Sequence, residues 1–156
     1  CSSDLAAGSN FPLFKDILKH VYGGDKAKAK ANNVGEVLYN RMILNSVFAT
    51  EAVRDAIKAN GGKKPSGEQI RAAFEGLQID GARLAKLGLK GFANPVSVSC
   101  VSHEGKNPGV FIQQWDGTKW KLITDFIPAM SDVVRPLVEK AAAAYAKENK
   151  ITPRKC

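Results

Sequence analysis

The sequence predicts an α/β protein that is rich in helix and poor in strand. Three observations carry this prediction. An apolar stripe at helical spacing runs through residues 34–60, and residues 95–101 alternate between apolar and polar types as in a strand. Residues 109–124 then form two further alternating segments around Asp116-Gly117, a dipeptide that favours a tight turn. The last strands are therefore expected to form a hairpin.

The predicted helices have recognisable starts and stops. Residues 11–22 have apolar side chains on one face, with Asn10 as a possible cap and Pro12 in the first turn. Ser66 and Gln69 match a capping box. We expect helices at 11–22, 34–60, 66–75, 80–87 and 136–148. The lysine-rich residues 25–33 are expected to form a polar loop.

Two of these helices carry more specific expectations. The helix at 34–60 has apolar side chains on most of its circumference near its centre, which predicts burial against more than one layer of structure. The last helix is expected to begin at Pro136, because a proline has no amide hydrogen to donate and fits best at the first helical position. Residues 131–135 would then form a separate turn.

The chain has 156 residues, 44% of them hydrophobic, and a formal net charge of +8. That length is sufficient for one domain with a core. The basic charge leaves open a module that binds polyanions. No aromatic residues alternate with the lysines of residues 26–30 or 63–64, so the sequence does not predict nucleic-acid binding. No segment reaches the roughly 20 apolar residues of a membrane span.

The chemistry-bearing residues are few. Cys100 and Cys156 form an even pair once Cys1 is set aside, and His103 follows Cys100 by three residues. These residues are too few for a structural zinc site, so no metal is expected. The pair can be a disulfide or two free thiols. A nucleophilic Cys100–His103 pair would still need a third group to orient it.

One cluster has the chemistry of a ligand site. Tyr39, Asn40 and Arg41 are consecutive, and an arginine can bind a carboxylate while asparagine and tyrosine supply oriented polar atoms. Alternatively, Arg41 pairs with Glu36 on the helix surface. Trp115 and Trp120 are expected to pack across the strand pair. No catalytic motif or cofactor fingerprint occurs, so we expect no enzyme and no cofactor, although an uncharacterised enzyme remains an alternative.

The C-terminal third also resembles a known family. Its two most distinctive segments are VxIQQWDGxKW at 110–120 and VRPLVExAAxxYAxE at 134–148, and the likeness extends upstream through 33–41 and 99–103. They resemble the periplasmic solute-binding proteins of ABC importers, in the branched-chain amino-acid family. The resemblance covers nearly all of residues 9–156.

The resemblance implies a type I fold with two lobes, of which this chain would be the C-terminal part. Residues 1–8 would be a non-native leader. The helices at 11–22, 34–60, 66–75 and 80–87 would belong to one lobe, and the strands and final helix would reach the other. Family members are more than twice as long, so the signal peptide is expected in a missing N-terminal part.

The same resemblance implies a function without catalysis. The protein would capture an amino acid or a related small carboxylate or amide by closing two lobes, then present it to the membrane permease of the importer. It would act in the periplasm, with no cofactor and no nucleic acid. An oxidising compartment makes a disulfide between Cys100 and Cys156 the expected pairing.

Overall fold

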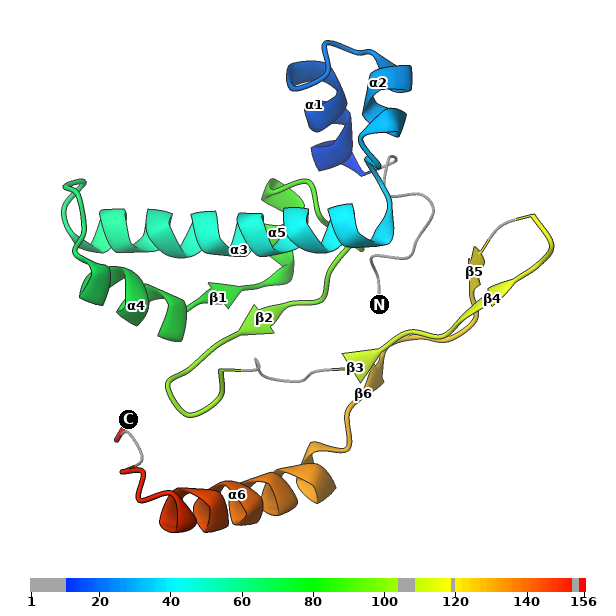
Figure 1. Ribbon diagram of the computed structural model, residues 1–156. Coiled ribbons are helices and arrows are strands. Elements are labelled where there is room, and N and C mark those ends of the chain that lie inside the picture. Colours follow the sequence, from blue (N-terminus) through cyan, green and yellow to red (C-terminus); the bar gives the residue numbers. More distant parts are fainter. Residues whose placement is uncertain (1–10, 104–108, 119, 153–154) are drawn as a thin grey trace.

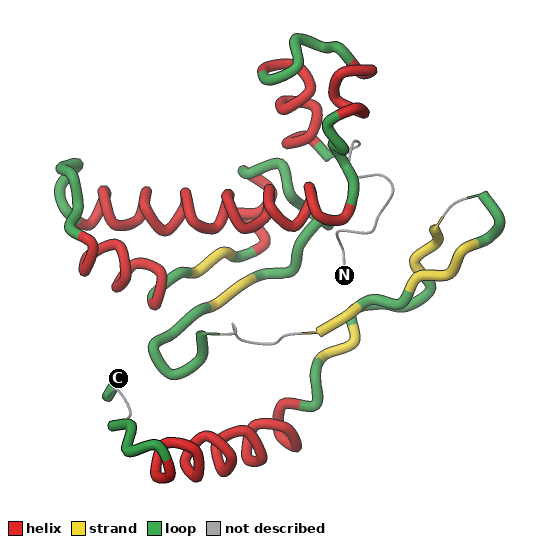
Figure 2. The backbone as a smooth tube through the Cα atoms, viewed as in Figure 1, coloured by secondary structure: helices red, strands yellow, loops and turns green. Residues whose placement is uncertain are grey.

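The computed structural model describes residues 11–103, 109–118, 120–152 and 155–156, so the predicted leader at 1–8 lies outside the described residues. Figure 1 shows a helical body formed by the first five helices and the first two strands. A long ribbon of paired strands, residues 109–118 and 120–128, leads from this body to the last helix. That helix lies apart from the body (Figures 1 and 2).

The body has helices in the four segments where the sequence predicts them. They are α1 (Pro12–His20), α3 (Val37–Ala59), α4 (Gly67–Glu75) and α5 (Gly81–Lys86). Their ends follow the local signals. Pro12 lies in the first turn of α1, and Asp80 accepts the amide hydrogen of Arg83 at 2.7 Å at the start of α5. At α4, Ser66 and Gln69 form the predicted capping box.

One helix occurs where a loop is expected. Residues Lys26–Ala31 form α2, because the Asp25 side chain accepts the amide hydrogen of Lys28 at 2.9 Å and caps the first turn. Alanine and lysine, which alternate through this segment, both have high helix propensity. The sequence did not predict this helix because its lysines leave no apolar periodicity. Of its residues, only Ala29 is buried.

The core of the body lies where α1, α3 and α5 meet the chain that follows α4. Phe14 of α1 packs against Phe92, with ring centroids 5.4 Å apart, and Phe11 meets the same ring edge-on at 5.1 Å. The buried cluster comprises Phe14, Ala52, Leu77, Ile79, Leu84, Leu89 and Phe92. Gly88 fits here because its φ is +70° and a Cβ would lie 2.7 Å from the Leu13 amide nitrogen.

The strands among the described residues form three two-stranded antiparallel sheets. In the body, β1 (Gln78–Ile79) pairs with β2 (Val96–Ser97), so only the first part of the predicted 95–101 segment is a strand. In the ribbon, β4 (Gln113–Trp115) pairs with β5 (Trp120–Leu122). The ribbon continues past the predicted hairpin of 109–124, because β3 (Gly109–Val110) pairs with β6 (Ile127–Pro128).

The predicted turn between β4 and β5 has the expected chemistry. Asp116 accepts the amide hydrogen of Thr118 at 2.9 Å, and Gly117 has a φ of +99°. Trp115 and Trp120 lie opposite each other in the register. The Trp115 side chain is half exposed, and the Trp120 side chain lies outside the described part, so its cross-strand packing stays a prediction.

One prediction about a helix needs qualification and another is wrong. In α3, the central side chains Ile43, Leu44, Val47 and Phe48 pack against the core, but Leu38 (72% exposed) and Met42 (62% exposed) nearer its start face solvent. The last helix, α6 (Ser131–Glu148), does not begin at Pro136 but carries this proline in its interior. A proline there removes one hydrogen bond to the carbonyl four residues earlier. Asp132, which is exposed, lies at that position, where water can bind its carbonyl.

An ion-pair network attaches α3 to α5 and β1. The Arg83 Nε donates to Glu51 at 2.8 Å, and its Nη1 and Nη2 donate to the two Asp55 oxygens at 2.9 Å each. Arg83 also donates to the carbonyl of Gln78 at 3.0 Å. Hydrogen bonds to Asp55 raise the pKa of Arg83, with a smaller contribution from Glu51. Arg83 therefore stays charged and orients three backbone segments at once.

We predict that Arg83→Ala destabilises the body by about 2–3 kcal/mol, because it leaves the Glu51 carboxylate buried without its strongest partner. The side chain of Glu51 is only 9% exposed. Urea denaturation followed by circular dichroism measures the change. The matched control is Arg54→Ala: Arg54 also contacts Glu51, at 3.2 Å, but is 68% exposed, so its loss should cost under about 1 kcal/mol. Equal losses for the two variants would contradict this account.

We also predict that the isolated chain associates in solution. On α6 and the ribbon, apolar side chains such as Leu137 (65% exposed), Val134 (52%) and Ile123 (53%) lie open to solvent. Exposed apolar side chains of this kind favour association. Sedimentation velocity should therefore show an average mass that rises with concentration, and Leu137→Lys should reduce this rise. A Leu137→Lys variant that associates as strongly as the parent would show that α6 takes no part.

Candidate functional site

The predicted ligand cluster lies on the first turns of α3, but its side chains do not converge. Asn40 is fully buried, and its amide donates to the carbonyl of Gly35 at 2.8 Å. Tyr39 is half-buried, whereas Arg41 is exposed. Successive helix residues point about 100° apart, which places the three side chains in different surroundings. A ligand role for Tyr39, Asn40 and Arg41 stays a prediction, and the contact of Asn40 supports the loop before α3.

Tyr39 has an unusual environment. Its ring lies 6.4 Å from that of Phe14. Burial, together with a hydrogen bond to the side chain of Tyr22, raises the pKa of Tyr39 to about 12 from its ordinary 10.0. The hydroxyl therefore stays protonated at neutral pH. It links α3 to the end of α1 and is not poised to act as a base.

A separate groove of about 350 Å³ lies between α3 and α4. Small side chains make up much of its wall: Ala56 and Ala59 come from α3, and Ala72 and Ala73 come from α4. The polar side chains of Asp55 and Gln69 also line it. None of the residues 39–41 takes part in this groove. Its walls offer room for an apolar group but show no convergent set of polar contacts for a charged ligand.

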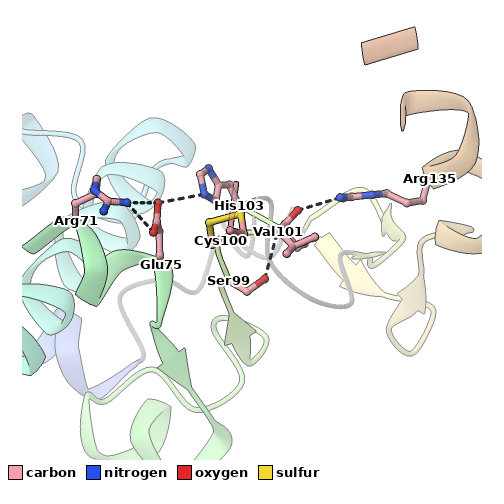
Figure 3. The surroundings of a disulfide bond; sticks show 9 residues. Arg71, Glu75, Ser99, Cys100, Val101, His103 and Arg135 are labelled. Atoms are coloured by element: carbon pink, nitrogen blue, oxygen red, sulfur yellow. Dashed lines mark hydrogen bonds and ion pairs between the residues drawn. A yellow bond between two sulfur atoms is a disulfide. The ribbon is translucent and has the colours of Figure 1, made fainter. Parts of the chain in front are cut away.

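The turn formed by Ser99–His103, which we call the junction turn, brings together contacts from three distant parts of the chain (Figure 3). Cys100 is bonded to Cys156 in a disulfide, with Cα atoms 5.5 Å apart. The carbonyl of Val101 accepts a hydrogen bond from Arg135 of α6 at 2.9 Å. His103 Nε2 lies 3.6 Å from Glu75 of α4.

The junction turn is also ordered internally. The amide of Ser99 donates to the carbonyl of Ser102 at 3.1 Å, and the amide of Ser102 donates back to Ser99 at 3.1 Å. On α4, both oxygens of Glu75 accept from Arg71 at 2.8 Å, which orients this carboxylate toward His103. The i,i+4 spacing of Arg71 and Glu75 was visible in the sequence, but their connection to the junction turn required the fold.

The structure gives no support to cysteine or metal chemistry here. Cys100 is engaged with Cys156, so it offers no thiolate to His103. Within the described residues, no group of three or more histidine, cysteine, aspartate or glutamate side chains is placed to hold a metal ion. In that same part of the chain, no helix has both the length and the apolar composition of a transmembrane span.

No protein family matches the chain, and no curated protein matches it. A solved structure does. It is described as an ABC transporter permease from the Pseudomonas fluorescens group, and it shares 38% sequence identity with this chain. The match covers 95% of this chain and has a TM-score of 0.80. It covers 36% of the other chain, so the present chain spans about a third of that protein.

This match supports a link to ABC transport and corrects the role that the sequence suggested. The prediction of a periplasmic solute-binding protein is wrong, because the similar structure is described as a permease. The predicted function, capture of a solute by closure of two lobes, is wrong for the same reason. The motifs at 110–120 and 134–148 form a hairpin and a helix, and such elements do not by themselves distinguish one transporter component from another. The two-lobed type I fold stays a prediction.

We predict that Tyr39 ionises at a higher pH than an ordinary tyrosine side chain. Because its pKa is raised in the fold, Tyr39 should ionise near pH 12, and folding stability should fall as the pH rises from 10 to about 12. Tyr22→Phe should lower the pKa of Tyr39 but leave it above 10, because burial is the larger cause. Ultraviolet absorbance of the phenolate measures both effects. Tyr145→Phe is the control, since Tyr145 is 61% exposed and its loss should leave the late transition unchanged.

Proposed function

We propose that this chain serves an ABC transporter and forms part of its permease component. The match to the permease structure carries the proposal: 38% identity over 95% of this chain, with a TM-score of 0.80. Identity of 38% over 95% of the chain goes beyond a shared arrangement of helices. Function then follows from the transporter as a whole, in which the permease provides the path for the solute.

The disulfide supports a location for this part of the protein. Disulfides form and persist in oxidising compartments and are rare where thiols are kept reduced. Cys100 and Cys156 lie 56 residues apart in sequence and are bonded in the fold. We therefore propose that this part of the chain lies on the periplasmic side of the membrane.

The chemistry of the cargo belongs to the same proposal. An amino acid or a related small carboxylate or amide is the expected solute. The partners would be the other subunits of the transporter, including the one that hydrolyses ATP. The role is transport without the making or breaking of a covalent bond in the solute, and it requires no cofactor in this chain.

Co-purification from native membranes tests the proposal. The protein is tagged in its own cells, extracted in mild detergent and purified, and the eluate is analysed by mass spectrometry. We expect an ATPase subunit with a GxxxxGK[ST] phosphate-binding loop in stoichiometric amount, together with ATP hydrolysis in the eluate. A protein that elutes without such a subunit, and without ATP hydrolysis, would contradict the proposed function.

Two variants make this test specific. Arg54→Ala removes only an exposed ion pair and should retain the ATPase subunit. Arg83→Ala disrupts the attachment of α3 to α5 and β1 and should lose the subunit in proportion to the loss of folded protein. Equal recovery of the ATPase with Arg54→Ala and with Arg83→Ala, despite a loss of folded Arg83→Ala protein, would identify the association as non-specific.

A further inference from the structure

The junction turn is where α6 is attached to the helical body. Three contacts converge on its residues 100–103: the disulfide from Cys156, the hydrogen bond from Arg135 and the ion pair to Glu75 (Figure 3). The first two come from the α6 side of the molecule, and the third comes from the body. Within four residues, the turn therefore connects α6 and the segment after it to α4.

The packing of α6 contributes little to holding it in place. No residue of α6 is buried. Its apolar side chains Val133, Val134, Leu137 and Val138 are all more than half exposed, at 57%, 52%, 65% and 53%. A helix without a buried face gains little from packing, so the position of α6 relative to the body depends strongly on the bonds at the junction turn.

The body does not depend on these bonds in the same way. Its buried core and the side chains packed against that core come from residues between Phe11 and Val98. All of them precede Cys100. Breaking the disulfide would therefore loosen α6 and leave the core contacts of α1, α3 and α5 in place. Local release with an intact core is the behaviour expected of a weakly held structural unit.

The disulfide is also open to attack. Cys156 is exposed and Cys100 is half-buried, so a thiolate can approach the Cys156 sulfur. We propose that the Cys100–Cys156 disulfide is a redox-controlled clamp, which holds α6 at the junction turn when oxidised and releases it when a protein dithiol reduces it. This inference does not depend on the transporter assignment.

The reaction is thiol–disulfide exchange. One thiolate of the dithiol attacks the Cys156 sulfur, the bond between the two sulfurs breaks, and Cys100 leaves as a thiolate. The second thiol of the dithiol then closes its own disulfide and releases Cys156. Two electrons pass from the dithiol to the cysteine pair, and two protons end on Cys100 and Cys156. Reoxidation by a disulfide donor reverses each step.

Hydrogen exchange in the two redox states tests the clamp. The 156-residue chain carries Cys1→Ser, so that Cys100 and Cys156 are its only thiols. Dithiothreitol is the probe, and exchange is followed by mass spectrometry. We expect amides of α6 (131–148) to exchange roughly tenfold faster or more after reduction, while amides of α3 and α4 keep their rates. Reoxidation should restore the slow exchange of α6.

Two variants complete the test. The chain with both Cys100→Ser and Cys156→Ser should exchange like the reduced chain with and without dithiothreitol, which excludes an effect of the reagent itself. Arg135→Ala should speed exchange in α6 of the oxidised chain by less than reduction does, because the covalent bond remains. The clamp is overturned if α6 exchanges equally in both redox states or if α3 and α4 accelerate as much as α6. It is also overturned if dithiothreitol leaves the native disulfide intact.

Discussion

The ion pairs and hydrogen bonds of Arg83 fix the relative positions of α3, α5 and β1, on which the placement of the junction turn depends. The Arg83 guanidinium bonds Glu51 and Asp55 on α3 and also the carbonyl of Gln78 at the start of β1. Planar, permanently charged and rich in donors, it can bind several acceptors at fixed angles. Because β1 pairs with β2, and β2 leads into the junction turn, the same bonds also position the site where α6 is attached.

The two parts of the chain hold their structure by different means. In the body, aromatic and aliphatic side chains bury one another around Phe14 and Phe92, so that the hydrophobic effect stabilises the arrangement. In the ribbon and α6, short ladders of backbone hydrogen bonds and single contacts dominate, and large apolar side chains face solvent. The body thus has a buried core, whereas the ribbon and α6 present surface for association. The disulfide between Cys100 and Cys156, 56 residues apart in sequence, joins these two parts.

The comparison with the permease structure corrects the expected role of the protein. It does not alter which residues carry polar or reactive groups. Residues 39–41 have polar groups suited to a carboxylate, yet the fold assigns Asn40 to the loop before α3 and leaves Arg41 exposed. For residues 100–103 the sequence suggested a disulfide from Cys100 but not the contacts of Val101 with Arg135 and of His103 with Glu75. Proximity in sequence therefore overstated one site and understated the other, because side-chain direction and long-range approach are properties of the fold.

The sequence by itself determined the elements whose signals are local. The capping box at Ser66 and Gln69, the Asp116-Gly117 turn and the helical periodicity of 37–59 all depend on residues a few positions apart. The tertiary structure alone decided which sides of α3 are covered, where α6 begins, and how Arg135 and Glu75 meet the junction turn. The last two contacts join groups 28 and 34 residues apart, and packing and chain topology set how such groups approach one another. A pattern within one segment carries no information about that approach.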